Sequence, residues 1–425
     1  MRFVLALLAC TLTLSAQTYV LKAAHLFDGK SDQAVSPGLI VVSGDKITAI
    51  GGALPPGAQV IDLGDATLLP GFIDAHTHLT MDFDPDYNGA RLRQTERTIP
   101  EQAIRATLNA RKTLLAGFTT VRDVGSSDFL DVGLRNSINS GVVPGPRMLV
   151  AVHAIGATGG HCDDGAGFRF GFLNHEAGPE DGVVDSADQA RFAVRFNIKY
   201  GADVIKTCPT GGVLSPTDAV DAPQLTQSEL DALVTAAHDL RRKTAAHAHG
   251  AEGAKRAIRA GIDSIEHGTF LDDEALRMMR EHGTYLVPTL SVRAGIAESK
   301  FPPLVQQKAD TAMKAQDDLV HRALASGVKI ALGTDAAVYP HGDNALEFVL
   351  LVKDGMTPAQ ALRAGTSVDA TLLGLDSQLG TLEPGKMADI VAVPGDPLKE
   401  IRATQSVLFV MRSGHIYRND RSQKF

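Results

Sequence analysis

The stretch LPGFIDAHTHL, residues 69–79, places an apolar run directly before two histidines that are separated by one residue. The run predicts a buried strand. On a strand, side chains two residues apart point to the same side, so the imidazoles of His76 and His78 can share one cation. A His-x-His pair alone is weak evidence, because such pairs often lie on protein surfaces. The rest of the chain decides whether this pair binds a metal.

Eight short apolar runs, of which this is the first, alternate with amphipathic helical segments between Pro70 and about Leu375. This alternation predicts a parallel β/α fold. Eight strands over residues 71–375 suit a closed (β/α)8 TIM barrel, and an open doubly wound sheet is the alternative. The runs are FIDAHTH (72–78), FTTVRDV (118–124), RMLVAVHA (147–154), ADVIK (202–206), TAAHAHG (244–250), IDSIEHG (262–268), TYLVPTL (284–290) and VKIALGTD (328–335).

The helices between these runs have clear start and stop signals. A Ser or Thr followed three residues later by Glu or Gln predicts a helix start, and this pattern occurs at Thr98, Ser186, Thr226 and Thr357. A glycine in the left-handed conformation is expected where a helical stretch ends before the next strand, and such glycines are Gly117, Gly201, Gly261 and Gly327.

The two ends of the chain differ from the middle in their pattern of apolar and polar residues. Residues 17–70 and 376–425 contain short alternating runs separated by Gly, Pro and Asp, which predict strands and turns. We expect these segments to form one small β-sandwich module into which the barrel, residues 71–375, is inserted.

Residues 1–17, MRFVLALLACTLTLSAQ, have an early Arg, an apolar stretch and a small-residue end. They resemble a secretory signal peptide of residues 1–16, which predicts a periplasmic or secreted protein. Lipoprotein processing at Cys10 is the second choice. The run is too short for a permanent membrane span. Cleavage after Ala16 leaves Cys162 and Cys208, which allow one intrachain disulfide; for Cys208, packing is the expected role.

Composition excludes several classes of partner. The 425 residues carry 41 basic and 49 acidic side chains, a formal net charge of −8, and no Trp. Without runs of Lys or Arg, we expect no nucleic-acid partner and no binding to an anionic membrane. The expected partner is a small-molecule substrate.

Polar residues close four further runs: Lys206, His247, His267 and Asp335. Each has an ordinary explanation, such as a lysine that reaches solvent or an aspartate that caps a helix. In a barrel, however, the carboxyl ends of the strands converge on one mouth. Imidazoles with a carboxylate favour a first-row divalent ion, above all zinc. An ammonium would be repelled there, so we expect Lys206 to be carboxylated by CO2, which makes it an anionic ligand.

The whole pattern resembles the amidohydrolase superfamily. The resemblance rests on LPGFIDAHTHL, on Lys206, His247 and His267 at their strand ends, on GTDA (333–336) and on LGTLEPGKMADIVAV (379–393). Further phrases resemble the branch of metal-dependent Xaa-Pro dipeptidases, carboxypeptidase-like enzymes and ochratoxin-hydrolysing amidases: ATGGH (157–161), IKTCPTGGVLSP (205–216), AHAHGAEGA (246–254) and DSIEHGT (263–269).

The resemblance implies two zinc ions per chain. One would be held by His76, His78 and Asp335, the other by His247 and His267, with N6-carboxylated Lys206 between them. A water activated by the ions would attack the scissile carbonyl, and Asp335 would act as the catalytic proton carrier. The expected reaction is hydrolysis of an amide bond to a C-terminal amino or imino acid, as in Xaa-Pro dipeptides, N-acyl amino acids and ochratoxin-type amides.

The same resemblance makes His161 and His249 candidates for substrate contact, with a role in orienting metal ligands as the alternative for each. Arg293 is a weaker candidate. Relatives assemble as homo-oligomers, so a homo-oligomer is expected. The alternative function is a cyclic-amide hydrolase of the imidazolonepropionase type. A deaminase would not need Lys206, and a non-catalytic scaffold would not keep all six ligand positions.

Overall fold

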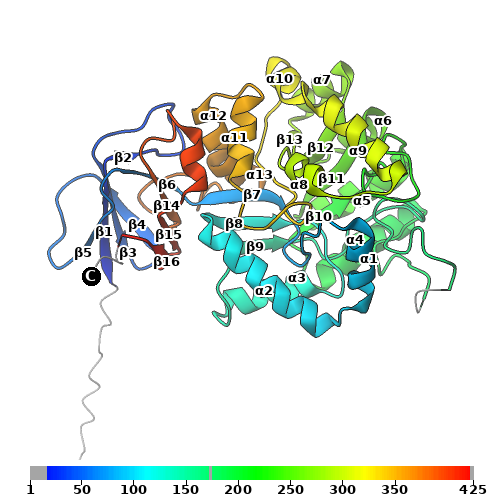
Figure 1. The fold of residues 1–425 in the computed structure, drawn as a ribbon, viewed down its shortest axis with the longest axis horizontal. Helices are drawn as coiled ribbons and strands as arrows, with labels where there is room; N and C mark the ends of the chain where they lie inside the picture. The colour runs from blue at the N-terminus through cyan, green and yellow to red at the C-terminus, as the bar shows by residue number, and fades with distance from the viewer. Residues whose placement is uncertain (1–16, 172–174, 422–425) are drawn as a thin grey trace, which may run out of the picture.

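The computed structural model describes residues 17–171 and 175–421. The predicted signal peptide lies outside these residues. The chain forms a small β-rich module beside a larger β/α part, and the first and last segments of the chain meet in the small module (Figure 1).

The small module consists of two sheets. One has the order β4-β3-β1-β5 and the other β16-β15-β14-β6-β2, so strands from both ends of the chain share the second sheet. Apolar residues of both sheets, such as Ile40, Leu68 and Phe409, form one buried cluster. The strands are β1 (Thr18–Ala23), β2 (His25–Leu26), β3 (Gly38–Ser43), β4 (Lys46–Ile50), β5 (Gln59–Asp62), β6 (Ala66–Pro70), β14 (Ile390–Pro394), β15 (Phe409–Arg412) and β16 (His415–Asn419).

The β/α part contains parallel strands in two groups, β7-β8-β9 and β10-β11-β12-β13. Their bounds are β7 (Phe72–Thr77), β8 (Phe118–Asp123), β9 (Arg147–Val150), β10 (Val204–Thr207), β11 (Lys243–Gly250), β12 (Ser264–Phe270) and β13 (Tyr285–Val287). Backbone hydrogen bonds join the two groups at one junction. The amide of Ile155 donates to the backbone carbonyl of Lys206, and the amide of Cys208 donates to the backbone carbonyl of Ile155. Seven of the eight predicted strands are therefore present.

The prediction of an eighth strand at 328–335 is wrong, because these residues do not form a regular strand. All of these residues are described, and they form no regular ladder. One isolated bridge joins Ile330 to Leu286, and a second joins Ala336, which follows the segment, to Thr77. The neighbouring β13 is short because Pro288 has no amide hydrogen to donate and Thr289 takes a left-handed φ of 51°. Even so, the amides of Ala75 and Leu286 donate to carbonyls of this segment, which connects β13 back to β7.

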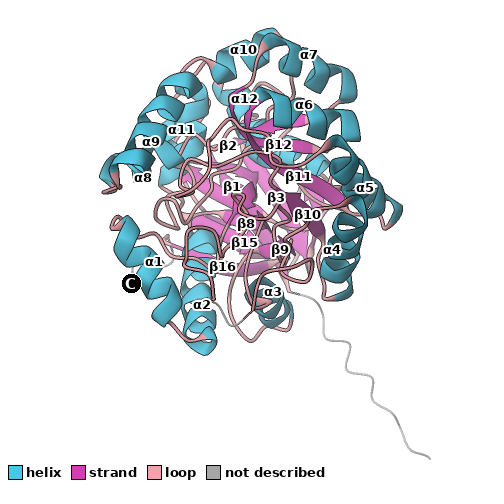
Figure 2. Ribbon diagram, turned by 90° about the vertical axis from the view of Figure 1, so that its right-hand side faces the viewer, coloured by secondary structure: helices cyan, strands magenta, loops and turns pink. Residues whose placement is uncertain are grey.

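Helices surround the parallel strands (Figure 2). They are α1 (Tyr87–Glu96), α2 (Ile99–Leu115), α3 (Leu130–Asn139), α4 (Ala187–Lys199), α5 (Gln227–Asp239), α6 (Ala251–Ala260), α7 (Asp273–His282), α8 (Val292–Glu298), α9 (Pro303–Gln316), α10 (Leu319–Ala325), α11 (Leu346–Lys353), α12 (Pro358–Arg363) and α13 (Asp369–Leu372), with a π-helix η1 (Ala364–Val368) and a 3-10 helix η2 (Ile401–Gln405). Within the described residues, no helix is long and apolar enough to cross a membrane.

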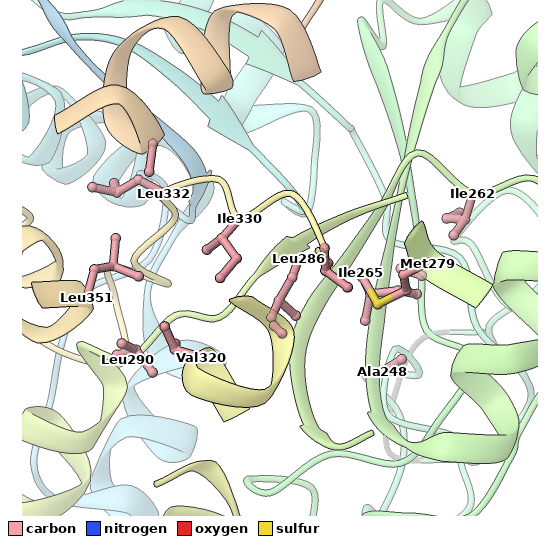
Figure 3. Packing of buried hydrophobic residues seen from close by; sticks show 14 of the residues in the cluster. Ala248, Ile262, Ile265, Met279, Leu286, Leu290, Val320, Ile330, Leu332 and Leu351 are labelled. Carbon is pink, nitrogen blue, oxygen red and sulfur yellow. The ribbon is translucent and has the colours of Figure 1, made fainter. Parts of the chain in front are cut away.

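The predicted helix boundaries are confirmed. The side chains of Thr98, Ser186, Thr226 and Thr357 each accept a hydrogen bond from the amide three residues later. The four glycines all have positive φ, between 74° and 113°. The helices pack on the strands through a continuous apolar core that includes Ile265, Leu286 and Leu332 (Figure 3). This packing holds the carboxyl ends of the strands in a fixed arrangement.

Candidate metal centre

Two of the predicted ligands, both imidazoles, meet around a third, a carboxylate. Asp335 Oδ1 lies 3.5 Å from His76 Nε2 and 3.4 Å from His78 Nε2. His76 belongs to β7 and His78 follows it directly. Asp335 is the last residue of the segment 328–335 and has a left-handed conformation with φ of 58°. That turn brings its carboxylate to the two imidazoles.

The histidines of β11 and β12 form a second group that adjoins the first. Ligand-capable atoms of His247, His249 and His267 lie within 4.8 Å of one another, and the same limit holds for His76, His267 and Asp335. His267 is therefore common to both groups, and they form one continuous centre. His249, expected to contact substrate, is as deeply buried as His247 and His267, with 6% of its surface exposed.

Four imidazoles are locked in one tautomer by a partner that can only accept a hydrogen bond. A ring nitrogen that donates to such a partner leaves the other nitrogen unprotonated and able to bind a metal. The partner of His267, Thr289 Oγ1, is an acceptor because its own hydrogen goes to the Pro288 carbonyl. The other pairs are His76 Nδ1 with Glu266 Oε2 at 2.7 Å, His78 Nδ1 with the Gly125 carbonyl at 3.1 Å, and His247 Nε2 with the Gly211 carbonyl at 3.2 Å.

The two candidates for substrate contact differ from these four. His161 Nδ1 lies 2.5 Å from Ser215 Oγ, and His249 Nδ1 lies 2.8 Å from Thr269 Oγ1. A hydroxyl can donate or accept, so either tautomer satisfies these pairs. Each ring can therefore present an Nε2 hydrogen to an anion. The ring of His161 also stacks on that of His247, with centroids 3.9 Å apart.

Burial keeps the site's histidines neutral. It lowers the pKa of His76, His247 and His267 well below the ordinary value, and nearby cationic groups add to the effect. It lowers the pKa of His161 to about 4 and that of His249 to about 3. Neutral imidazole is the form that binds metal.

Lys206, on β10, is 3% exposed. Burial lowers the pKa of its ammonium to about 8, although the charges of Glu266 and Asp335 act in the opposite direction. Burial also raises the pKa of Asp335, against the charges of His78 and Lys206. The donor set, neutral imidazoles in fixed tautomers with a carboxylate and a lysine, fits a first-row divalent metal.

Arg293 lies outside this centre. Its guanidinium donates to the carbonyl and side chain of Gln316 and to Asp354, so it ties α8 to α9 and α11. Of the residues considered as candidates, Arg293 alone has a structural role that its partners explain fully.

Comparison with known proteins gives the family. Residues 67–417 match the Amidohydrolase family. The chain belongs to that family. Ochratoxinase of Aspergillus niger is 32% identical over 375 residues, which are 83% of this chain and 75% of the relative. The crystal structure of a Xaa-Pro dipeptidase with methionine bound in its active site is 42% identical, with a TM-score of 0.89 over 95% of this chain and 100% of that one. A prolidase complexed with N-methylphosphonate-L-proline is 29% identical, with a TM-score of 0.84 over the same shares.

These relatives establish that the protein is a hydrolase of the type that acts on amide bonds. The similar solved structures imply a TIM barrel with an additional domain. Amidohydrolases depend on metal, and the His and Asp groups described above can hold one. The predicted superfamily and branch are confirmed.

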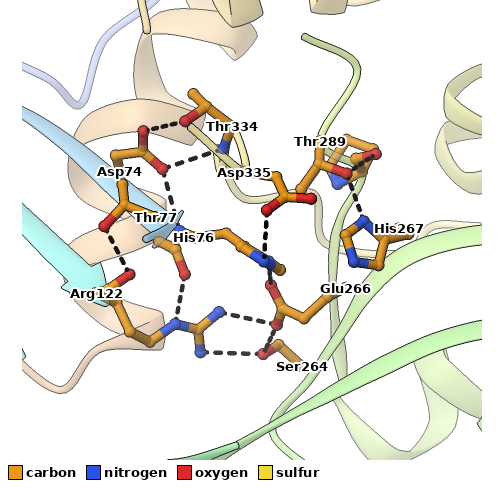
Figure 4. A network of polar contacts seen from close by, with 12 residues as sticks. Asp74, His76, Thr77, Arg122, Ser264, Glu266, His267, Thr289, Thr334 and Asp335 are labelled. Atoms are coloured by element: carbon orange, nitrogen blue, oxygen red, sulfur yellow. Dashed lines mark hydrogen bonds and ion pairs between the residues drawn. The ribbon is translucent and has the colours of Figure 1, made fainter. Parts of the chain in front are cut away.

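Sequence reasoning missed a charged network beneath the metal centre of this amidohydrolase. Glu266 accepts from Arg122 at 2.8 Å, from Ser264 at 2.5 Å and from His76 at 2.7 Å (Figure 4). Arg122 and Glu266 are completely buried. A signal for both was present, since each is a charged residue within a predicted strand, but their partnership spans 144 residues.

A second buried carboxylate ties β7 to the segment that carries Asp335. Asp74 accepts hydrogen bonds from the Thr334 hydroxyl at 2.6 Å, the Thr334 amide at 3.1 Å and the Asn344 amide group at 2.8 Å. It also accepts from the His76 amide at 3.1 Å. Asp74 therefore fixes two predicted ligands, His76 and Asp335, relative to each other. Burial raises its pKa to about 6 against these hydrogen bonds.

Proposed function

We propose that this protein is a binuclear zinc amidohydrolase that cleaves the amide bond to a C-terminal amino or imino acid. The observation that carries the proposal is the convergence of four tautomer-locked histidines, a carboxylate that is 13% exposed and a buried lysine on one centre. The similarity to a Xaa-Pro dipeptidase, a prolidase and ochratoxinase supports the substrate class.

In this proposal His76, His78 and Asp335 would hold one ion and His247 and His267 the other, with carboxylated Lys206 between them. Burial supports the modification, because a lysine of pKa about 8 has far more of its side chain as the neutral amine, which attacks CO2 and then loses a proton, than a solvated lysine has. When bound, the ions supply Lewis acidity that activates water and polarises the scissile carbonyl.

The protein's own groups then handle protons and substrate. Asp335 takes the proton of the attacking water and delivers it to the departing amine, which otherwise leaves poorly. Its raised pKa suits both steps. His161 and His249, whose tautomers are free, donate from Nε2 to the substrate carboxylate. The four histidines assigned to metal each donate to a partner that only accepts, whereas the two assigned to substrate are paired with a hydroxyl that can donate or accept.

Metal content, chelation and a substrate panel test the proposal. We expect about two zinc ions per chain by elemental analysis, loss of activity on chelation and its return with zinc. The panel contains Xaa-Pro dipeptides, N-acyl amino acids and ochratoxin A, with release of the amine as the readout. Turnover of cyclic imides or lactones instead would favour the imidazolonepropionase-type alternative. Full zinc content and full activity in Lys206→Ala would refute the carboxylated bridge.

We also propose that the parallel strands form a closed (β/α)8 barrel with residues 328–335 at the eighth position. The hydrogen bonds at both junctions support this closure. Export through the signal peptide and assembly into a homo-oligomer are further proposals. N-terminal sequencing of the mature protein, with residue 17 expected first, and light scattering test them.

A further inference from the structure

A disulfide lies at the rim of the metal centre. It joins Cys162, in the loop after β9, to Cys208, one residue beyond the end of β10, with their Cα atoms 6.0 Å apart. Cys162 follows His161 directly, and Cys208 is two residues from Lys206. The cross-link therefore joins the loop after β9 to the end of the neighbouring β10, next to His161 and Lys206.

The residues around His161 are shaped to hold it. Besides its contacts with Ser215 and His247, its backbone amide donates to Gln224 Oε1 at 2.9 Å. Gln224 in turn donates to Asp218 at 2.9 Å, and Lys308 of α9 donates to the other oxygen of Asp218 at 3.1 Å. Asp218 and Lys308 are both less than one-tenth exposed. His161 thus has a buried, charged support that leads back to a helix of the scaffold.

Glycines provide the space for this arrangement. A Cβ at Gly212 would lie 2.1 Å from His161 Nδ1, and one at Gly156 would lie 2.9 Å from Cys162 Cβ. A Cβ at Gly160 would lie 2.7 Å from the Gln224 oxygen. The Gly-Gly pairs in the phrases ATGGH and PTGG are therefore partly explained by close packing around His161 and the disulfide.

We propose that the Cys162–Cys208 disulfide is a positioning element of the active site, which fixes His161 against His247 and substrate. This inference rests on the proposed function for its catalytic consequence. A disulfide with only a structural role would stabilise the fold by closing a 46-residue separation, and its loss would lower Tm without changing kcat/KM of the folded protein. The positioning role instead acts through His161.

The primary test compares wild type with Cys162→Ser/Cys208→Ser in the presence and absence of His161→Ala. We expect loss of the disulfide to lower kcat/KM about tenfold, because small displacements of positioned groups carry large rate costs. In the His161→Ala background the same change should cost less than about twofold, since the two act as one unit. Equal fold-losses in both backgrounds, or an unchanged kcat/KM, would overturn the proposal.

Two further perturbations keep both cysteines, so they test the proposal even if the cysteine variant misfolds. Gly212→Ala places a methyl group against the His161 ring and should reproduce the loss of the cysteine variant. Reduction of the wild type with tris(2-carboxyethyl)phosphine, which supplies the two electrons, should lower activity. Removal of the phosphine and reoxidation with glutathione disulfide, which takes the two electrons back, should restore it. Arg191→Ala, in an exposed ion pair on α4, is the matched control for substitution and should change nothing. Full activity in Gly212→Ala would count against the role of His161.

A readout without catalysis separates this inference from the proposed function. Hydrogen exchange in the metal-free protein should accelerate at the amides of Gly156 and His161, which donate to Gly182 and Gln224, when the cysteines are replaced. Unchanged exchange there would overturn the positioning role even in an active enzyme. Accelerated exchange in the cysteine variant, together with a wild type that hydrolyses none of the panel, would refute the proposed function and leave the disulfide's role standing.

Discussion

The buried pair of Arg122 and Glu266 makes the substitution Glu266→Gln a sharp test of the metal centre. Gln keeps the size of the side chain but removes the anion that Arg122 faces at 2.8 Å, with both groups completely buried. Breaking such a pair from one side costs about 3 to 5 kcal/mol, because an uncompensated charge stays in the interior. The Gln amide nitrogen would also face a donor, since Glu266 accepts from Arg122, Ser264 and His76.

The same substitution weakens metal binding by a separate route. Glu266 fixes the His76 ring with Nε2 toward the site, and loss of such an outer partner lowers metal affinity about 10- to 100-fold. Urea denaturation of the metal-free variant measures the first effect, and zinc competition with a chelator measures the second. The unfolding measurement comes first, on metal-free protein, because bound zinc would itself stabilise the folded state and mask the loss.

Arg122→Met/Glu266→Gln is the matched control. With both charges gone, the free energy of unfolding should return to within about 1 kcal/mol of the wild type. The Gln oxygen can then accept from His76, so zinc affinity should partly recover. A single Glu266→Gln variant whose unfolding free energy stays within about 1 kcal/mol of wild type would refute the reasoning about the buried pair.

Four further predictions concern catalysis, titration and zinc uptake. Asp335→Asn should lower kcat by at least about 100-fold, because the amide cannot carry the proton, while the fold stays intact by circular dichroism. Asp74 has a folded pKa of about 6 against 3.8 unfolded, so the unfolded state releases its proton first and stability should fall by up to about 3 kcal/mol as pH rises from about 4 to 6. Thermal denaturation at a series of pH values should show that Tm of Asp74→Asn depends less on pH across that window than Tm of the wild type. The same dependence in both proteins would contradict the prediction. Lys206 has a folded pKa of about 8 against 10.5, so stability of the metal-free protein should rise with pH between those values. Zinc uptake should also require bicarbonate, and equal uptake in its absence would count against carboxylation.

The local parts of this fold were predictable because neighbouring residues decide them. The Ser and Thr helix caps and the left-handed glycines depend on contacts within three or four residues. The spacing of His76 and His78 depends only on strand geometry. The prediction of an eighth strand at 328–335 was wrong because a strand needs a regular neighbouring strand to pair with along its length. Its neighbour β13 ends at Val287, before Pro288 and the left-handed Thr289.

The sequence by itself determined which side chains stand at the strand ends, and hence the expected ligand set, because side-chain alternation along a strand is a local property. The tertiary structure decided the chemical state of those side chains. Glu266 and Thr289 set the tautomers of His76 and His267, burial sets the pKa of Lys206, and Cys208 meets Cys162. These features depend on partners tens to hundreds of residues away in the chain, so only the folded arrangement of strands brings them within hydrogen-bonding or covalent distance.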